Sequence, residues 1–163
     1  MDRTRPDLIA RYKAGHRVVT EALAGITDAE LDTPEAPGEW TPRQVAHHLA
    51  DSEMTSAIRL RRLLAEDHPV IDGYDQEEFA RRLQYDRPIA ASLATLAAVR
   101  QTTAELLDRL SEADWARAGT HSESGRYGVD DWLRIYAAHA HDHADQIRRA
   151  RSAFGGNVPS TLV

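Results

Sequence analysis

The sequence contains no cysteine, a single lysine (Lys13) and no long apolar run. Without cysteine, a disulfide framework, a thiolate-bound zinc ion and a cysteine nucleophile are all excluded. Any sulfur chemistry must therefore come from a bound ligand. The polar N-terminus leads into no apolar signal core, and no segment is apolar enough to span a bilayer. We therefore expect a cytoplasmic protein with no membrane partner.

The chain also has fewer basic than acidic residues. The chain has 20 Lys and Arg against 26 Asp and Glu, for a formal net charge of -6. Nucleic-acid binding relies on clustered Lys and Arg side chains, so we expect no nucleic-acid partner. A length of 163 residues is typical of one domain with a sizeable core, and residues 1–163 are predicted to form a single domain.

Apolar residues recur at helical spacing in four long segments. The first is the stretch from Leu8 to Leu23, and the third begins after Pro88. The second has Thr41 as N-cap with Pro42 next, completes a capping box with Gln44 and runs to about residue 66. The fourth starts near residue 130. These helices predict an all-α four-helix bundle.

Two smaller features interrupt the long helices. Residues 75–83 are predicted to form a short extra helix, after a turn at residues 72–74. Residues 116–129 contain three glycines and have no helical period, which predicts a loop or small hairpin before the last helix. Because the connection between the second and third helices is long, the pattern leaves the topology open.

The last helix contains a pair of histidines, His139 and His143, four residues apart. This spacing puts both imidazole rings on one face, one turn apart, where they could bind one metal ion. Trp132, Tyr136 and Ile147 share that stripe, so both rings are predicted to point inward. Ala140 stands where a zinc protease of the H-E-x-x-H type has its glutamate, so the pair does not match that signature.

A catalytic metal usually has three protein ligands and one open position. On the second helix, His48 lies between Val45 and Leu49 on the more apolar stripe, whereas the pattern favours a solvated position for His47. His68 is predicted to lie at the surface. Periodicity therefore prefers His48 as the third ligand without proving it.

Two motifs together resemble the DinB superfamily. The first is the run from Glu39 to Met54, which includes Trp40-Thr-Pro and His47-His48-Leu; the second is Tyr136-x-x-His139-x-x-x-His143-x-x-Gln146-Ile147. The run Pro69-Val-Ile-Asp-Gly-Tyr-Asp75 and the loop Gly119-Thr-His121 also match, so the resemblance covers nearly the whole chain. It is closest to the YfiT-like branch of metal-dependent hydrolases and bacillithiol S-transferases.

The resemblance implies a bundle with helices ordered up-down-down-up, a metal triad of His48, His139 and His143, zinc or nickel as the metal, and a homodimer. The triad agrees with the periodicity argument above. Ser122 stands where relatives often have proline, and Gly128 where a threonine often opens the last helix. Glycine is tolerated as an N-cap, so these departures bear on the rim of the pocket and on the substrate.

Other polar residues near the motifs are candidates for supporting roles. Asp51, Glu53 and His121 could act as a base or support the ligands, although the pattern slightly favours a solvated helix face for Asp51 and Glu53. Tyr136 and Gln146 are candidate substrate-binding groups. Packing is the preferred role for Tyr136, and Gln146, one turn below His143, is expected to hydrogen-bond across the bundle in support of the metal ligands. Trp40 is expected to fill the core at the start of the second helix.

An open three-His metal site allows two reactions on a small-molecule substrate. The metal can acidify water for hydrolysis, or bind a low-molecular-weight thiol and present its thiolate to an electrophile. The resemblance favours thiol transfer, with bacillithiol or mycothiol as the thiol, and a metal-dependent hydrolase is the alternative. A third possibility is a metal-binding or small-molecule-binding stress protein without turnover.

Overall fold

The computed structural model describes residues 3–157. The ends of the predicted domain, residues 1–2 and 158–163, lie outside this range. Within the described residues, no helix combines the length and apolar character that a membrane crossing needs. The elements in chain order are α1 (Arg5–Leu23), α2 (Asp28–Leu31), α3 (Pro42–Ala65), β1 (Val70–Ile71), α4 (Gln76–Arg82), α5 (Ala90–Leu107), α6 (Glu112–Trp115), β2 (Ala118–His121), β3 (Gly125–Gly128) and α7 (Val129–Asn157).

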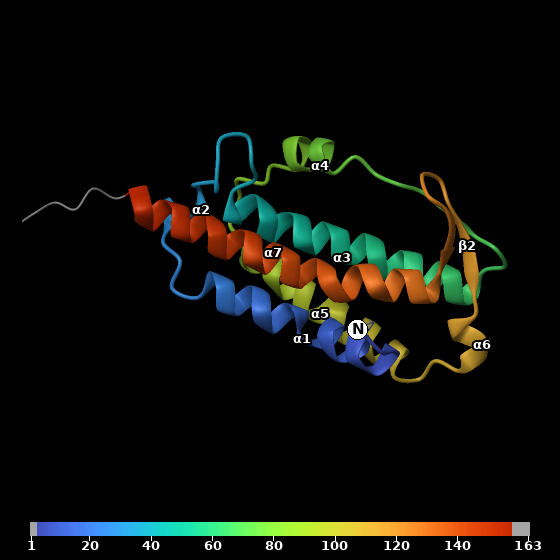
Figure 1. Cartoon of the computed structure of the whole chain (residues 1–163). Helices are drawn as coiled ribbons and strands as arrows, with labels where there is room; N and C mark the ends of the chain where they lie inside the picture. Colours follow the sequence, from blue (N-terminus) through green and yellow to red (C-terminus); the bar gives the residue numbers. More distant parts are fainter. Residues whose placement is uncertain (1–2, 158–163) are drawn as a thin grey trace, which may run out of the picture.

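Helices α1, α3, α5 and α7 form a four-helix bundle, as the sequence predicts (Figure 1). Helix α1 packs against α5 and α7, and α3 packs against the same two helices. Helices α1 and α7 run in one direction and α3 and α5 in the other, so the order is up-down-down-up. Because α3 and α5 run in the same direction, the chain must return along the bundle between them. Residues 66–89 make this return.

Local signals in the sequence set where the site-bearing helices begin. The Thr41 hydroxyl accepts the Gln44 N–H at 3.2 Å and the Gln44 side chain accepts the Thr41 N–H at 2.9 Å, which is the predicted capping box. Helix α7 begins directly after Gly128, whose N–H donates to the Asp131 carboxylate at 2.9 Å. An acidic group in this position also suits the positive end of the helix.

The predicted loop or hairpin is a hairpin, β2–β3, and it belongs to a three-stranded sheet that the sequence did not predict. Strand β1 pairs in parallel with β2, with Ile71 opposite His121. Gly119 makes this approach possible, because a Cβ there would lie 2.2 Å from the Pro69 carbonyl oxygen. The sheet fastens one end of the 66–89 return to the bundle.

The core consists of two clusters of buried apolar residues along the bundle. One contains Tyr12, Leu60 and Trp132, and the other Val19, Leu49 and Leu96. Helices α3 and α5 also contribute a buried ion pair, Glu53 and Arg100, whose side chains are 1% and 3% exposed.

Candidate metal centre

Three histidines from two helices converge between α3 and α7, with His48 buried and His139 and His143 half-buried. His48 on α3 and His139 and His143 on α7 each offer a ring nitrogen, and these nitrogens lie within 4.8 Å of one another. The Nε2 atoms of His48 and His139 are 3.2 Å apart. Ring centroids are separated by 4.6 to 5.2 Å with the rings steeply inclined to one another. The inward direction predicted for all three side chains agrees with this arrangement.

Burial keeps these imidazoles neutral. Desolvation, aided by neighbouring His143, lowers the pKa of His48 to about 3. It also lowers the pKa of His139 well below its usual range, with further contributions from His143, His48 and Arg100. The pKa of His143 is lowered for the same reason, although its bond to Gln146 opposes the shift. Neutral imidazole is the form that binds a metal.

The geometry fits one divalent cation. Two ligands at roughly 2.0–2.1 Å from a tetrahedral metal lie about 3.4 Å apart, which is close to the 3.2 Å between the nitrogens of His48 and His139. Nε2 of His143 is also free to face this position, because the Nδ1 atom of that ring bonds to Gln146. Three imidazole nitrogens on neutral rings are a typical donor set for such a cation.

Two neighbouring side chains hold the histidines in place. The Gln146 side-chain oxygen accepts the Nδ1–H of His143 at 2.8 Å, which leaves Nε2 as the nitrogen available for a metal. Gln146 therefore supports a ligand as expected, but it does so on its own helix and not across the bundle. The Trp40 ring packs edge-on against His48, with centroids 4.8 Å apart, and donates its indole N–H to Glu77 on α4 at 3.1 Å.

A cavity of about 560 Å³ opens beside the histidines. It lies between the segment before α3, the start of α4 and the middle of α7, and so it depends on the long return between α3 and α5. Its lining residues are Gly38, Glu39, Trp40, Gln76, Glu77, His139, His143 and Gln146. Trp40, for which the sequence favours a core role over a platform for substrate, borders both the core and the cavity.

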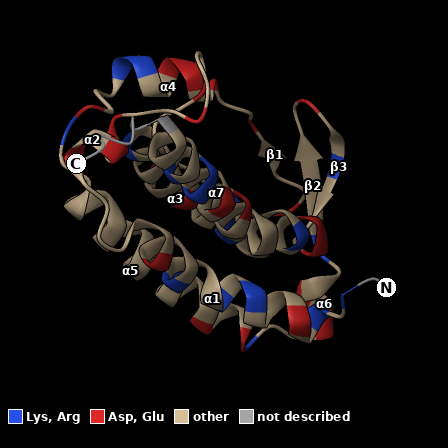
Figure 2. Cartoon of the chain, turned by 60° about the vertical axis from the view of Figure 1, so that its left-hand side comes forward, with Lys and Arg blue, Asp and Glu red and all other residues tan. Residues whose placement is uncertain are grey.

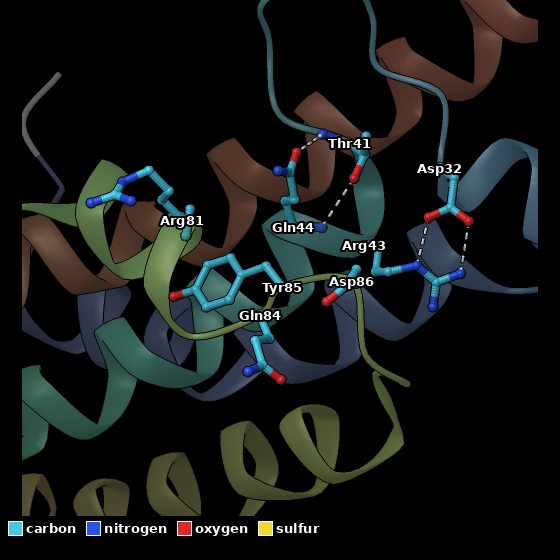
Figure 3. Close-up of a pocket in the computed structure, with 9 residues that line it drawn as sticks. Asp32, Thr41, Arg43, Gln44, Arg81, Gln84, Tyr85 and Asp86 are labelled. Atoms are coloured by element: carbon cyan, nitrogen blue, oxygen red, sulfur yellow. Dashed lines mark hydrogen bonds and ion pairs between the residues drawn. The ribbon is translucent and has the colours of Figure 1, made fainter.

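A second hollow of about 420 Å³ lies at the start of α3, between Asp32 and the turn after α4 (Figure 3). Several of its polar groups are already paired. Thr41 and Gln44 form the capping box, and Asp32 accepts two hydrogen bonds from Arg43. This hollow therefore offers fewer free groups for chemistry than the histidine cavity.

The structure places the three supporting candidates away from the cavity lining. Glu53 is buried, not solvated, and binds Arg100 and the Tyr12 hydroxyl. Burial raises the pKa of Glu53, and the Arg100 guanidinium acts in the opposite direction. Asp51 is half-buried and accepts the Tyr85 hydroxyl at 2.6 Å.

His121 lies in the hairpin, where its ring packs on Tyr127 and its Nδ1 accepts the Glu123 N–H at 3.2 Å. Tyr136 packs as expected, with its ring 5.9 Å from that of His139, and its hydroxyl accepts a hydrogen bond from Arg59 at 3.2 Å. Neither His121 nor Tyr136 is among the described residues that line the cavity.

The prediction that His47 is solvated is wrong, and the reason is the breadth of the buried arc on α3. His47 is fully buried, with Nδ1 2.7 Å from the Ser92 hydroxyl and Nε2 2.8 Å from the Arg87 carbonyl. Because α3 contacts α4, α5 and α7, more than one stripe of the helix is covered. His68 is exposed, as predicted.

Sequence reasoning missed Arg100 although a signal was present. Leu93, Leu96, Arg100, Thr103 and Leu107 follow one another by three or four residues, so Arg100 occupies the buried stripe of α5. Its guanidinium donates to Glu53 at 2.7 Å and to the carbonyl oxygens of Tyr12 and Tyr136 at 3.1 and 2.9 Å. A charged residue in phase with a buried stripe needs a buried partner of opposite charge.

Residues 11–147 match the family model described as the DinB superfamily. The chain belongs to the DinB superfamily. A protein of Oceanobacillus iheyensis named "Putative metal-dependent hydrolase OB0782" is 38% identical over 131 residues, covering 80% of this chain and 76% of that protein. A Bacillus mycoides protein, "Putative metal-dependent hydrolase BcerKBAB4_2443", is 33% identical over 133 residues, or 82% and 77% of the two chains.

Two solved structures have a similar four-helix-bundle fold. The first is described as "YfiT from Bacillus subtilis is a probable metal-dependent hydrolase with an unusual four-helix bundle topology". It aligns with a TM-score of 0.87 and 29% identity, covering 94% of this chain and 91% of that one. The second, TT2238, is described as a four-helix bundle protein and aligns with a TM-score of 0.62 and 26% identity, over 87% and 96% of the two chains.

Proposed function

We propose that this chain is a metal-dependent enzyme in which His48, His139 and His143 hold one divalent cation beside a cavity that admits a small molecule. The observation that carries the proposal is the convergence of three neutral imidazoles, two of which line that cavity. Three protein ligands leave one coordination position for water or substrate, which is the pattern of catalytic zinc sites. The names of the relatives agree with metal dependence.

Each part of the site has a physical role. A divalent cation held there supplies Lewis acidity, which lowers the pKa of a water or thiol that reaches the open position. Gln146 orients His143 through its Nδ1–H, and Trp40 limits the access of water to His48 by covering its ring. The cavity binds the rest of the small molecule and holds its reacting atom near the triad.

For the reaction we favour transfer of a low-molecular-weight thiol, of the bacillithiol or mycothiol type, to an electrophile. The S–H bond breaks and its proton passes to solvent; the sulfur forms a bond to the electrophilic carbon, and the leaving group departs with the electron pair of its bond. This reaction needs no protein base. A reaction without a protein base suits this site, because Asp51, Glu53 and His121 bind other partners.

Hydrolysis is the second candidate, and the names of the relatives favour it. In this case a water molecule takes the place of the thiol and attacks an ester, an amide or a similar bond. The same three histidines serve both reactions, so geometry around the triad does not separate them. The decision depends on which nucleophile the cavity admits.

Metal content tests the triad. We expect elemental analysis to find about one zinc or nickel ion per chain in the wild type, and little in His48→Ala, His139→Ala or His143→Ala. His141→Ala is the matched control, because His141 lies between two of the ligands on α7 but its Nε2 binds the Arg11 carbonyl at 3.0 Å. Full metal content in all three ligand variants would contradict the proposal.

Activity separates the two reactions and the binding-only alternative. The metal-loaded protein is assayed for conjugation of monochlorobimane with several thiols, and for turnover of activated esters and amides. Metal-dependent conjugation with one thiol supports the transferase, whereas turnover of esters or amides alone supports the hydrolase. Bound metal with neither activity would instead indicate a binding protein.

The homodimer implied by the resemblance is also a proposal. Light scattering coupled to size-exclusion chromatography measures the mass of the protein in solution. A mass near twice the 18.2 kDa of one chain is the expected result, and a mass near 18.2 kDa would contradict it.

A further inference from the structure

Two ligands of the triad differ in how their rings are oriented. Nδ1 of His143 is bonded to the side chain of Gln146 on the same helix. A histidine that binds a metal normally makes such a bond, because it fixes the tautomer and the direction of the ring. Nδ1 of His48 is buried and has no hydrogen-bond partner among the described residues. The orientation of the His48 ring therefore depends on packing.

Trp40 provides this packing from outside the triad. Its ring centre lies 4.8 Å from that of His48, and the two ring planes are inclined by 63°. The other aromatic neighbours of His48 in the described part of the chain are the two remaining triad histidines. The Trp40 indole N–H donates to Oε2 of Glu77 at 3.1 Å. A side chain of α4 thus helps to set the position of the ring that covers His48.

Helix α4 belongs to a segment that is anchored at its two ends. Figures 1 and 2 both show α4 outside the four-helix bundle, on the side of α3. Residues 72–84, which we call the strap, lie between Ile71 and Tyr85, which are 1% and 2% exposed. The Tyr85 hydroxyl also donates to Asp51 at 2.6 Å. No residue of the strap itself is buried, so its middle is held less firmly than its ends.

The bond between Trp40 and Glu77 fastens the middle of the strap. Figure 2 shows acidic residues at the start of α4 and basic residues at its end. The basic residues, Arg81 and Arg82, bind Glu78 within the helix. In the described part of the chain, no hydrogen bond other than that of Glu77 joins an α4 side chain to a residue outside the helix. A helix of seven residues is not stable alone in water, so α4 depends on such contacts.

We propose that Glu77 is a positioning residue for the metal centre: it holds the Trp40 ring against His48 and so couples the docking of α4 to the binding of the metal. This inference rests on the metal site proposed above and extends it to the strap. A His48 ring that is already fixed loses less conformational freedom when it binds the cation. Coupling between two equilibria is reciprocal, so a cation that fixes His48 also stabilises the docked α4.

The strength of the bond between Trp40 and Glu77 limits the size of this coupling. Removal of a group that bonds directly to a metal ligand typically lowers metal affinity about 10- to 100-fold. Glu77 is exposed and acts through Trp40, so the limit is the net contribution of one hydrogen bond. Such a bond changes an equilibrium constant about two- to ten-fold. By reciprocity, the same factor applies to the effect of the metal on the docking of α4.

The first test compares metal affinity in the wild type, Glu77→Ala and Glu77→Gln by competition with a chelator. Glu77 is exposed, so both variants are expected to fold. Glu77→Ala removes the acceptor and should lower the affinity about two- to ten-fold. Glu77→Gln removes the charge but keeps an oxygen that accepts the Trp40 N–H, and it should retain most of the affinity. An equal loss in both variants would refute the proposal, because the effect would then come from charge.

Glu78→Ala is the matched control. Glu78 lies in the same turn of α4 and carries the same charge, but it binds Arg81 and Arg82 and not Trp40. Ion pairs at the surface contribute little, so this change should alter metal affinity less than about two-fold. A loss as large as that of Glu77→Ala would refute the proposal, because it would come from α4 as a whole.

The second test measures hydrogen exchange of the backbone amides of α4 with and without metal. Undocking of this short helix exposes its amides to exchange. Metal should slow the exchange about two- to ten-fold in the wild type and in Glu77→Gln, and should have little effect in Glu77→Ala. This readout does not depend on activity.

Failure of the inference and failure of the proposed metal site give different results. If the wild type binds no metal, or all three ligand variants keep it, the metal site is refuted and this inference with it. If the wild type binds metal through the triad and Glu77→Ala has the same affinity, only the inference is refuted. A metal response of α4 that is unchanged in Glu77→Ala would refute it as well.

Discussion

The buried pair of Glu53 and Arg100 makes a strong prediction about stability. We expect Glu53→Gln to lower the free energy of unfolding by about 3–5 kcal/mol, because it leaves the Arg100 charge buried without its partner. Glutamine keeps nearly the same volume, so no cavity contributes to this loss. A domain is typically stable by only about 5–15 kcal/mol, so the variant is expected to be marginal but measurable.

The contacts of Arg100 explain why its charge stays buried when Glu53 is replaced. Its guanidinium lies 4.0 Å from the centre of the Tyr12 ring and donates to two backbone carbonyls as well as to Glu53. Arginine does not lose its proton in proteins, whereas a glutamate left alone can become neutral by gaining one. Arg100→Met is therefore expected to cost less at pH 5 than Glu53→Gln does.

The double variant Glu53→Gln/Arg100→Met completes the comparison. Removing both charges is expected to recover part of the loss, since a buried ion pair replaced by neutral groups is often close to neutral in stability. Urea denaturation of the metal-free protein measures each free energy without the added stabilisation from bound metal.

An exposed pair provides the control for this experiment. Arg17 and Glu21 form an i,i+4 bridge with side chains 68% and 53% exposed, and Glu21→Gln should cost no more than about 1 kcal/mol. If Glu53→Gln costs as little as this control, the reasoning about a buried unpaired charge is refuted.

Three further predictions concern packing, ligand orientation and pH. Gly15→Ala should lose about 1–3 kcal/mol in urea denaturation, because its Cβ would lie 2.6 Å from the pinned guanidinium of Arg100. Gln146→Leu should weaken metal binding about 10- to 100-fold in competition titrations with a chelator, because it removes the acceptor that orients His143. The pKa of His48 is lowered from 6.5 to about 3, so the unfolded chain takes up its proton first as the pH falls. The contribution of His48 to the stability of the metal-free protein is therefore fully present above pH 6.5 and is lost between pH 6.5 and 3. At pH 5 the free energy of unfolding should be lower by about 2 kcal/mol, and His48→Gln should reduce this pH dependence.

Each of these has an outcome that contradicts it. Gly155→Ala, in helix α7 with open space around it, should gain up to about 1 kcal/mol, and an equal loss at Gly15 and Gly155 would argue against the packing explanation. Gln101→Leu, on the exposed face of α5, should leave metal affinity unchanged. A free energy of unfolding that does not change between pH 7.5 and pH 5 would be inconsistent with the burial of neutral histidines.

The sequence by itself determined the four long helices and the inward direction of the three histidines. Both follow from local rules: the 3.6-residue period puts His139 and His143 on the stripe of Trp132, and the capping box at Thr41 sets the start of α3. Such signals act within one or two turns of helix, so they can be read without knowledge of the rest of the chain.

Only the tertiary structure decided which side chains surround the histidines. Glu53 and His47 are buried because α3 is covered by α2, α4, α5 and α7, and Arg100 is buried because α5 packs against α1 and α3. The pattern of a single helix does not show how many neighbours each of its faces will have. The cavity with Glu39 and Glu77 exists because the long return between α3 and α5 places the start of α4 beside Trp40. These contacts join residues far apart in the chain, and their positions depend on packing rather than on local periodicity.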